Sequence, residues 1–500
     1  MIATRSVWTT AASEVESQSL TGNAAADVCV IGGGIAGLTA AYRLLAAGRS
    51  VLLLEADAPG RGETAHTTAH LAWVLDDRFS RLADIRGDDV ARLAASSHRS
   101  AIADIEQVAG DEGIDCDFAR VRGYLFPGAD GPEALDAERE AVGRLGLDHA
   151  AVDAVPLLGG PGLEFPGQAR FHPTKYLGGL AAAVRRRGGD IRSNTRAVRV
   201  TGGEPCTVET AGGGTVTARA VVVATNAPFD AGLTLHARLS AYTTYALALP
   251  VPTGSVPDAL FWDTEDPYHY TRVLPAGDGR ATDYLIVGGG DHKTGQAADQ
   301  GDRWARLTAW AEARYPVAGG AAFHWSGQVF ETADGLGLIG AAPWGKNVYV
   351  ITGDSGMGLT HGTLGGRLVS DLITGTATPL AAVYDPGRWT PGAAYTLLKE
   401  NANLAAQYTD WVTGGDVSSA DQVPPEHGAV LRRGLSKVAV YRKPDGSVCE
   451  RSATCPHLGA VVRWNPGEQT WDCPAHGSRF TSDGKVFHGP AVGDLGEAGG

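Results

Sequence analysis

Two short loops near the end of the chain place the tightest constraint on how it can fold. They read Cys455-Pro-His457-Leu-Gly and Cys473-Pro-Ala-His476-Gly-Ser, so each loop offers one thiolate and one imidazole. Two thiolates can bind one iron of a [2Fe–2S] cluster while two imidazoles bind the other. From about residue 427 onward, short apolar runs alternate with turn signals that contain Gly and Pro. The sequence therefore predicts a small all-β domain that holds a cluster through these four side chains.

Zinc is the alternative metal, because two Cys and two His also make a closed tetrahedral site. In zinc fingers the cysteines normally come as one pair and the histidines as the other. Here each loop mixes the two ligand types, and a glycine follows the histidine in both loops. The mixed loops favour the cluster.

A second feature lies near the start of the chain, where residues 27–56 read as a strand, a glycine turn, a helix and a second strand. The turn carries Gly32-x-Gly34-x-x-Gly37, and Glu55 ends the second strand. Glycines at these positions let the backbone approach a pyrophosphate at a helix N-terminus, and the acidic side chain can bind ribose hydroxyls. Glycines needed only for tight helix–strand packing are the alternative. NAD and FAD share this pattern.

A third motif favours FAD over NAD. The apolar run at 347–354 ends in a glycine turn and is followed by a helical pattern. Glycine amides and the new helix N-terminus can face the pyrimidine edge of a flavin and stabilise negative charge on the reduced ring. The cofactor contacts predicted here are Gly353, Asp354, Gly356, Met357, Gly358, Leu359 and Thr360.

With these motifs, residues 26–375 resemble the D-amino-acid-oxidase-like FAD-dependent oxidoreductases, which include glycine and sarcosine oxidases and dimethylglycine dehydrogenase. The stretches 221–226 and 325–335 support the resemblance. Residues 428–495 resemble the Rieske [2Fe–2S] domain, including Gly489-Pro490-Ala491, which is similar to its proline loop. The implied fold class is α/β, a Rossmann-like FAD-binding domain with an interleaved α+β substrate domain, plus a C-terminal all-β Rieske domain.

The expected domain plan follows from the same resemblance. It is an N-terminal arm (1–25), an oxidoreductase (26–395) whose FAD-binding parts are about 26–115, 170–230 and 335–380, a helix and linker (396–426), and the Rieske domain (427–497).

The Rieske loops depart from the respiratory and photosynthetic pattern. Ala460 and Ala475 stand where those proteins carry two disulfide-linked cysteines, so the segment resembles the cytosolic, ferredoxin-like branch. Ser478 matches a serine that donates a hydrogen bond to cluster sulfur, whereas Phe480 replaces a tyrosine donor. Fewer hydrogen bonds to sulfur lower the potential, so we expect a low-to-intermediate value.

The oxidoreductase resemblance also implies where flavin and substrate are held. His66, Thr67 and Thr68 fall at the family's first flavin-contacting loop, and His66 aligns with a histidine that some members join covalently to FAD; polar contacts to a non-covalent flavin are the alternative. Family members oxidise the carbon next to an amine. Arg272, Tyr245 and His269 are the predicted catalytic residues, since arginine can clamp a carboxylate and aromatic faces suit an ammonium group. Tyr242, Tyr268 and Tyr270 are further candidates for substrate contacts. A packed strand face is the alternative for residues 267–272.

The fusion predicts an electron route from an amine or amino-acid-like substrate through FAD to the cluster, and on to an external acceptor that is ferredoxin-like or quinone-linked. The reverse direction is physically allowed. One alternative is an oxygen-using amine oxidase whose cluster serves structure or sensing. Another is an electron-transfer module supplied by a pyridine nucleotide.

Composition narrows the partners and the compartment. The 56 Asp and Glu outnumber the 42 Lys and Arg, and the formal net charge of −14 repels phosphate backbones, so nucleic acid is excluded as an expected partner. No uncharged apolar run approaches the ~20 residues that a membrane-spanning helix needs. The N-terminus lacks the apolar core of a secretory signal, and six scattered cysteines do not form a disulfide scaffold. We expect a cytoplasmic protein.

Overall fold

Two large sheets and two small ones organise the part of the chain that the computed structural model describes, residues 4–11, 18–129, 131–230, 235–277 and 280–498. The first large sheet is parallel in its centre. In sheet order its strands are β16 (Leu338–Ala341), β17 (Val348–Thr352), β10 (Thr215–Asn226), β1 (Ala24–Ile31), β2 (Val51–Leu54) and β7 (Asp190–Arg192), with β9 (Cys206–Thr210) and β8 (Ala197–Thr201) attached through β10.

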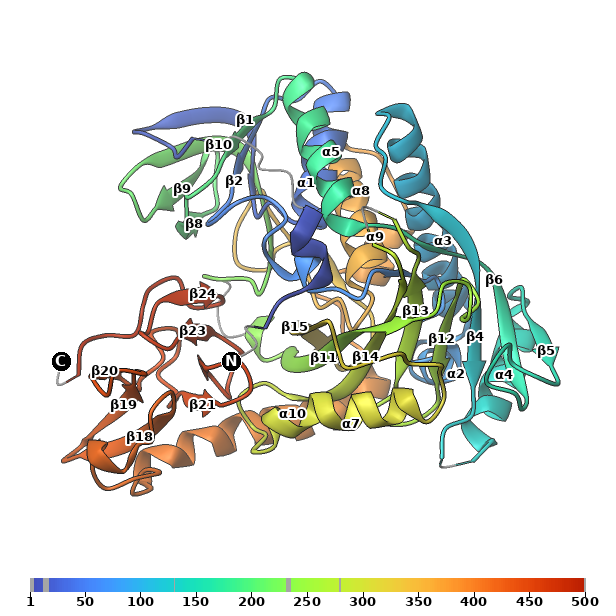
Figure 1. Cartoon of the computed structure of the whole chain (residues 1–500). Coiled ribbons are helices and arrows are strands. Elements are labelled where there is room, and N and C mark those ends of the chain that lie inside the picture. Colours follow the sequence, from blue (N-terminus) through green and yellow to red (C-terminus); the bar gives the residue numbers. More distant parts are fainter. Residues whose placement is uncertain (1–3, 12–17, 130, 231–234, 278–279, 499–500) are drawn as a thin grey trace.

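Helices cover this first sheet (Figure 1). They are α1 (Ile35–Ala46), α5 (Pro173–Arg186), α8 (Gly358–Thr374) and α3 (Asp88–Asp111), and α1 packs directly against α8. Small residues permit that close approach: a side chain at Gly366 would overlap the backbone of Ala40. A side chain at Gly37 would overlap the carbonyl of Gly32. The glycines of the first motif therefore also permit close helix–strand packing, which was the alternative role considered for them.

The second large sheet is mainly antiparallel. Its order is β15 (Phe323–Thr332), β11 (Leu239–Val251), β14 (Asp283–Lys293), β13 (Tyr270–Leu274), β12 (Ala259–Asp263), β4 (Ala119–Phe126), β6 (Gly162–Arg170) and β3 (His70–Leu71), with β5 (Ala150–Val152) on β6. Helix α7 (Gln300–Glu312) packs on one face of β11 and β14. The opposite face is open to the cavity described below. This sheet interrupts the strands of the first sheet in the chain, as expected for an interleaved substrate domain.

The remaining helices lie around these layers. They are α2 (Phe79–Arg86), α4 (Glu133–Leu145), α9 (Leu380–Tyr384) and α10 (Ala394–Ala406), with 3-10 turns η1 (Val7–Ala11), η2 (Glu63–Ala65), η3 (Pro391–Ala393), η4 (Gln407–Val412) and η5 (Ala420–Gln422). Helix α10 buries none of its residues and leads from the oxidoreductase part of the chain into the C-terminal lobe (Figure 1).

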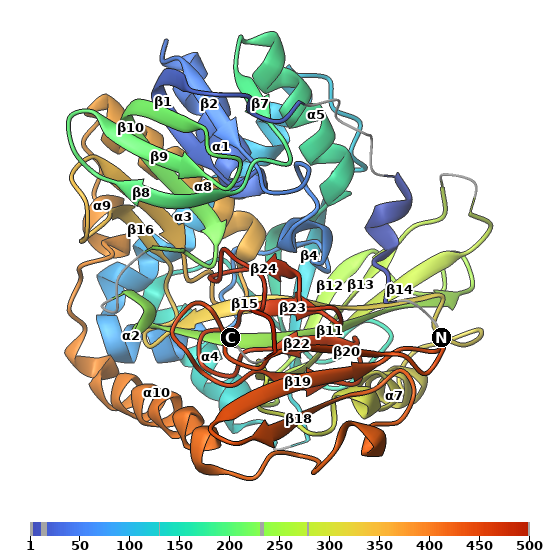
Figure 2. The same cartoon turned by 90° about the vertical axis from the view of Figure 1, so that its left-hand side faces the viewer.

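The C-terminal lobe is all-β, as predicted. One sheet holds β18 (Gly428–Arg433), β19 (Ser436–Arg442) and β20 (Val448–Ser452), and the other holds β21 (Arg463–Asn465), β22 (Thr470–Asp472), β23 (Arg479–Thr481) and β24 (Val486–His488). Figure 2 shows this lobe in front of β11 and β15. In the described residues, no helix has both the length and the apolar character needed to cross a membrane.

Candidate functional site: a shared cavity beside two Cys–His loops

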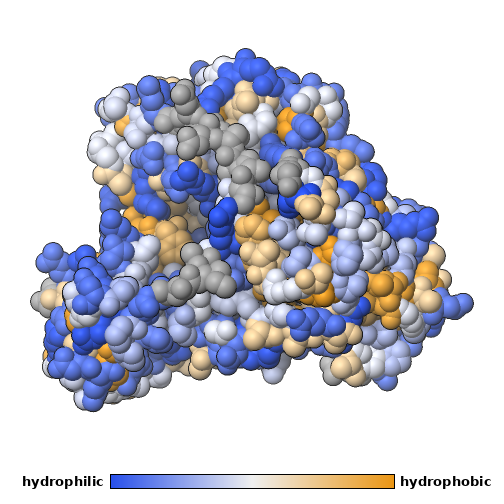
Figure 3. Space-filling model, in the orientation of Figure 1, coloured by the Kyte–Doolittle hydropathy of each residue, from blue (hydrophilic) through white to orange (hydrophobic). Residues whose placement is uncertain are grey.

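A cavity of about 870 Å³ lies where the two large sheets and the C-terminal lobe meet. Its volume is within the range of cofactor and ligand sites. Residues of the first glycine motif line one end, the inward face of the second sheet lines another, and residues 487–492 of the C-terminal lobe close a third side. Figure 3 shows the surface indented between the part built on the first large sheet, at the top of the view, and the C-terminal lobe.

The first motif forms the nucleotide end of the cavity. Gly32 and Gly34 line it, and helix α1 starts at Ile35, whose N–H donates to Oγ1 of Thr64 over 3.3 Å. Gly34 provides no side-chain cap, so other N–H groups of the first turn are available to an anion. The N–H of Gly33 donates to Oε2 of Glu55 over 2.6 Å. Burial raises the pKa of Glu55. This cradle, in which a side chain at Gly33 would crowd the backbone of Pro59, fits a dinucleotide.

The third motif forms the neighbouring wall, where β17 passes into α8. Gly353 and Gly356 have φ of 71° and 83°, which favour glycine. Asp354, Gly356, Gly358 and Leu359 line the cavity. The other predicted contacts, Gly353, Met357 and Thr360, belong to the same turn and helix start but are not among the lining residues. Gly37 likewise lies behind the lining, inside α1.

The loop with His66, Thr67 and Thr68 lines the cavity beside the glycine turn. Its backbone is held by two tryptophans: Trp8 Nε1 donates to the carbonyl of Thr67 over 2.6 Å, and Trp325 Nε1 donates to the carbonyl of His66 over 2.8 Å. His66 Nδ1 lies 3.1 Å from the carbonyl of Gly62. The predicted flavin-contacting residues are thus brought together on one wall.

The three predicted catalytic residues, in contrast, do not line the cavity. Tyr245 lies on β11, where Tyr242 and Thr244 face the cavity. Because side chains alternate along a strand, Tyr245 faces the opposite side, in a cluster with residues of α7. Its hydroxyl lies 3.0 Å from His292 Nε2, and its ring packs edge-on against Trp304.

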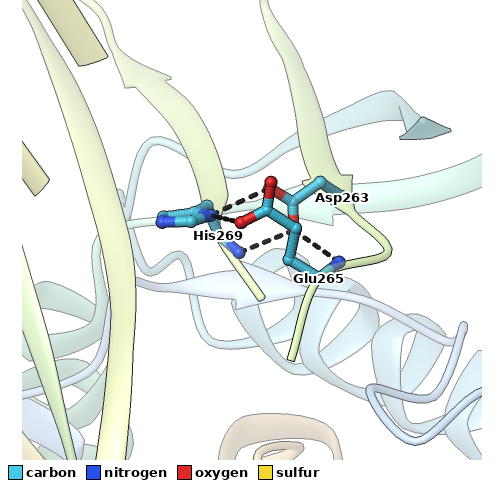
Figure 4. Close-up of side chains that lie close together, drawn as sticks. All are labelled: Asp263, Glu265 and His269. Carbon is cyan, nitrogen blue, oxygen red and sulfur yellow. Dashed lines mark hydrogen bonds and ion pairs between the residues drawn. The ribbon is translucent and has the colours of Figure 1, made fainter. Parts of the chain in front are cut away.

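His269 belongs to a turn between β12 and β13 (Figure 4). Its Nδ1 lies 2.9 Å from Oδ2 of Asp263 and 3.5 Å from Glu265, and its ring stacks on Trp310 at 4.4 Å. Ligand atoms of these three residues lie within 4.8 Å of one another. However, Oδ1 of Asp263 accepts the backbone N–H groups of both Glu265 and His269. The cluster is a hydrogen-bonded turn, and it places His269 outside the cavity lining.

Arg272 is buried next to the cavity rather than in it. Its Nη1 donates to the carbonyls of Ala69 (2.7 Å) and Phe171 (3.3 Å), and its guanidinium lies 5.3 Å from the ring centre of Trp8. Burial lowers its pKa to about 9. Arg272 on β13 therefore connects the loop at Ala69 to the second sheet. The carbonyl of Ala69 could not be identified as its partner from the sequence alone.

The cavity contains residues that sequence reasoning missed. Asp76, Asp291 and Glu331 line it together with Tyr242, Tyr268 and Tyr270. His361 also lines it, and its Nε2 has no hydrogen-bond partner among the described residues. None of the carboxylates sits in a recognisable motif. The three tyrosines, in contrast, are among the substrate contacts that the sequence predicts.

The two Cys–His loops come together at the tips of the C-terminal lobe. Both cysteines are buried, and the rings of His457 and His476 lie 5.1 Å apart. Each loop is closed by backbone hydrogen bonds, from Cys455 to Ala460 (2.9 Å) and from Cys473 to Ser478 (2.8 Å). Each turn thereby presents its two ligand side chains toward the other.

The donor set fits a binuclear cluster. The Nδ1 atoms of His457 and His476 are buried and have no hydrogen-bond partner among the described residues, so both are free to ligate a metal. Within the described residues, three ligand atoms lie within 4.8 Å of one another only at Asp263, Glu265 and His269. Four ligands of a single zinc ion would lie that close together. The spread of the Cys–His set therefore favours two irons over one zinc.

Contacts join the cluster loops to the oxidoreductase part, and one of them continues to the flavin-contacting loop. His236 Nε2 lies 3.2 Å from His457 Nε2. Gln328 donates from its side chain to the carbonyl of Gly477 over 2.7 Å, and its backbone N–H donates to Glu63 over 2.6 Å. Glu63 is on the flavin-contacting loop, so a single residue links that loop to the cluster loop.

The proline loop makes a second link. The N–H of Ala491 donates to the hydroxyl of Ser478 over 3.0 Å, and Ser478 hydrogen-bonds Cys455. His488 Nε2 pairs with Oε1 of Glu63 at 2.8 Å. Residues 487–492 therefore touch the cluster loops on one side and line the cavity on the other.

Comparison with known proteins agrees with this geometry. Residues 27–372 match the family described as FAD dependent oxidoreductase (DAO), and residues 414–497 match the Rieske [2Fe-2S] domain. The chain is 31% identical over 480 residues to the Rieske 2Fe-2S iron-sulfur protein YhfW of Bacillus subtilis, covering 94% of this chain and 92% of that protein.

Two further relatives cover the oxidoreductase part. Gamma-glutamylputrescine oxidoreductase of Escherichia coli is 28% identical over 376 residues, 70% of this chain and 84% of that protein. The crystal structure of glycine oxidase from Geobacillus kaustophilus superposes with a TM-score of 0.59 at 20% identity, covering 73% of this chain and all of the other, which shows the shared fold. The chain therefore belongs to the DAO family of FAD-dependent oxidoreductases and carries a C-terminal Rieske [2Fe–2S] domain.

Proposed function

We propose that this protein oxidises an amine or amino-acid-like substrate with FAD and relays the electrons through the Rieske cluster to an external acceptor. One observation carries the proposal: residues 487–492 of the Rieske domain line the same cavity as the dinucleotide motif. Bound FAD would supply two-electron acceptance, and the cluster would supply one-electron transfer.

The residues of this chain would divide the work. Gly32, Gly34 and Glu55 would hold the nucleotide part of FAD, and the turn at Asp354–Gly358 would face the flavin ring. Substrate oxidation removes a hydride from the carbon and a proton from the nitrogen, which leaves a C=N bond. Water then hydrolyses that bond to a carbonyl compound and an amine.

The connections between the two sites support the relay. The Glu63–His488 pair and Gln328 fix the cluster loops against the flavin-contacting loop. Cys455, His457, Cys473 and His476 would hold the cluster, with the Nε2 side of His457 turned toward His236 in the oxidoreductase part. A ferredoxin-like or quinone-linked carrier is the proposed acceptor. None of the six cysteines forms a disulfide, which supports a reducing, cytoplasmic compartment.

Reoxidation kinetics test this proposal against an oxygen-using oxidase. The holoenzyme is reduced with light under anaerobic conditions and mixed either with aerated buffer or with a ferredoxin or soluble quinone. We expect the one-electron carriers to reoxidise the flavin faster than oxygen, with peroxide well below one equivalent. Stoichiometric peroxide, with carriers no faster than oxygen, would contradict the relay and favour the oxidase.

A further inference from the structure

The inward face of the second sheet presents acidic and aromatic side chains to the cavity. Tyr242 on β11, Tyr270 on β13, Asp291 on β14 and Glu331 on β15 all line it. Asp76 contributes a further carboxylate from the segment between β3 and α2. These side chains come from strands that are far apart in the sequence but adjacent in the sheet.

Five described Lys or Arg side chains line the cavity; Arg196 and Lys399 lie outside the second sheet, and the other three are engaged in contacts of their own. Arg81 pairs with Asp77, Arg78 donates to the carbonyl of Thr264 (3.0 Å), and Arg238 donates to the carbonyl of Arg388 (2.7 Å). Across the described residues of β11, β13, β14 and β15 that line the cavity, none is basic. Acidic side chains outnumber basic ones in the lining as a whole. The described side chains that these four strands present to the cavity therefore include no guanidinium that could clamp a substrate carboxylate.

Among the described residues, no salt bridge pairs Asp76, Asp291 or Glu331 with a basic side chain. Oδ1 of Asp291 is buried and has no hydrogen-bond partner among the described residues. Burial, reinforced by neighbouring acids, raises the pKa of Asp76 to about 7 and that of Glu331 to about 8. Burial also raises the pKa of Asp291 to about 6. Such a set is costly to keep ionised unless a cation enters among it.

The aromatic rings complete a site for a cation. Tyr268 and Tyr270 have ring centres 5.1 Å apart, and the hydroxyl of Tyr268 donates to Oδ2 of Asp76 over 2.6 Å. The hydroxyl of Tyr270 is held by Thr244 at 2.9 Å, which orients its ring. Aromatic faces attract ammonium groups, and a carboxylate nearby adds charge-assisted hydrogen bonds.

We propose that the substrate is an alkylamine or diamine with a net positive charge and no carboxylate of its own, bound by Asp291, Glu331 and Asp76 against Tyr268 and Tyr270. This inference rests on the proposed amine oxidation and narrows its substrate class. It replaces the expected carboxylate clamp by Arg272, because Arg272 does not line the cavity and its Nη1 donates to the carbonyls of Ala69 and Phe171.

A matched pair of ligands tests the inference on the wild-type holoenzyme. 1,4-Diaminobutane and 4-aminobutyrate each contain four carbons, but a carboxylate replaces one terminal aminomethyl group in the second. Binding is followed anaerobically by calorimetry and by the change in the flavin absorption band. We expect the diamine to bind about tenfold more tightly or better, and n-butylamine to lie between the two. Equal or tighter binding of 4-aminobutyrate, or binding of neither diamine nor butylamine, would overturn the inference.

Variants locate the effect. The pair Asp291→Asn with Glu331→Gln should weaken diamine binding about tenfold or more, since both removed charges face the cavity. Glu312→Gln, which removes one negative charge from the exposed end of α7, is the control and should bind as wild type. Unchanged diamine affinity in a folded, flavin-loaded double variant would contradict the assignment. If that variant does not fold, the wild-type ligand comparison decides alone.

The inference and the proposed function can fail separately. Reduction of the cluster by light-reduced flavin needs no amine, so a failed relay leaves the binding preference standing. Preference for 4-aminobutyrate with an intact relay would leave the relay standing and remove only the substrate class.

Discussion

The cluster loops and the cavity wall are built in opposite ways. The four cluster ligands come from one stretch between Cys455 and His476, and each loop is closed by its own backbone hydrogen bonds. The cavity wall draws Asp76, Tyr242, Tyr270, Asp291 and Glu331 from separate elements that only the second sheet brings together. Chemistry fixed by local spacing can be recognised in a sequence, whereas chemistry fixed by strand face and sheet order cannot.

The largest expected effect is at the cluster loops. Cys473→Ala removes one of two thiolate ligands, so we expect iron and sulfide to fall to background while FAD still binds. Iron and sulfide analysis together with the visible spectrum measures both cofactors. Cys449→Ser in β20, outside the ligand loops, is the control and should retain the cluster. A Cys473→Ala protein that keeps a full cluster would contradict the assignment of the cluster ligands to these two local loops.

The glycine motif at the nucleotide end comes next. Gly37→Ala places a methyl group against the carbonyl of Gly32, a backbone atom that cannot move aside. We expect a loss of about 3 kcal/mol in stability and a fall in FAD occupancy. Gly110→Ala in α3, where an added carbon meets nothing within 4 Å, should be tolerated. Melting temperature and flavin content report the result, and equal values for the two variants would contradict it.

The Glu63–His488 pair tests the junction between the two regions. Burial raises the pKa of Glu63, but the charge and hydrogen bond of His488, with smaller contributions from His66 and the N–H of Gln328, outweigh it and bring the pKa to about 2. Because this is below the pKa of an unfolded glutamate, the pair stabilises the protein above pH ~4.5, and that contribution is lost as the pH falls toward 2. Glu63→Gln should lower stability by roughly 3 kcal/mol at neutral pH.

The difference between wild type and Glu63→Gln should shrink in acid, as followed by melting temperature from neutral pH downward. Glu204→Gln removes an exposed carboxylate paired with Lys346 and should change little. A constant difference at all pH values would mean that the ionised pair is not what joins the two parts.

The smallest expected effects distinguish a tyrosine on the core side of the second sheet from one on its cavity side. Tyr245→Phe loses only the hydroxyl contact to His292 and should cost about 1 kcal/mol in stability without changing amine binding. Tyr270→Leu removes a ring that faces the cavity and should weaken diamine binding about 3- to 10-fold. The opposite outcome, weaker binding in Tyr245→Phe alone, would reverse the assignment of faces.

Particular elements show what the sequence could and could not reveal. β1, α1 and β2, and likewise β17 and α8, follow from apolar runs and glycines that act on their neighbours in the chain. The face on which Tyr245 lies depends on the register of β11 within the sheet. A shift of one position along the strand would move its side chain from the core to the cavity. Arg272 could not be placed because its partners at Ala69 and Phe171 are brought by other strands. The carboxylates of the wall lack any local motif, so only the assembled sheet shows their common orientation.

The most direct test of the central claim is low-temperature EPR during anaerobic, light-driven reduction of the bound flavin, because it requires no substrate. Electron relay predicts a Rieske-type signal that grows in step with the bleaching of the flavin band. Full bleaching without that signal, in a protein that contains iron and sulfide and gives the signal with dithionite, would contradict electron transfer from FAD to the cluster.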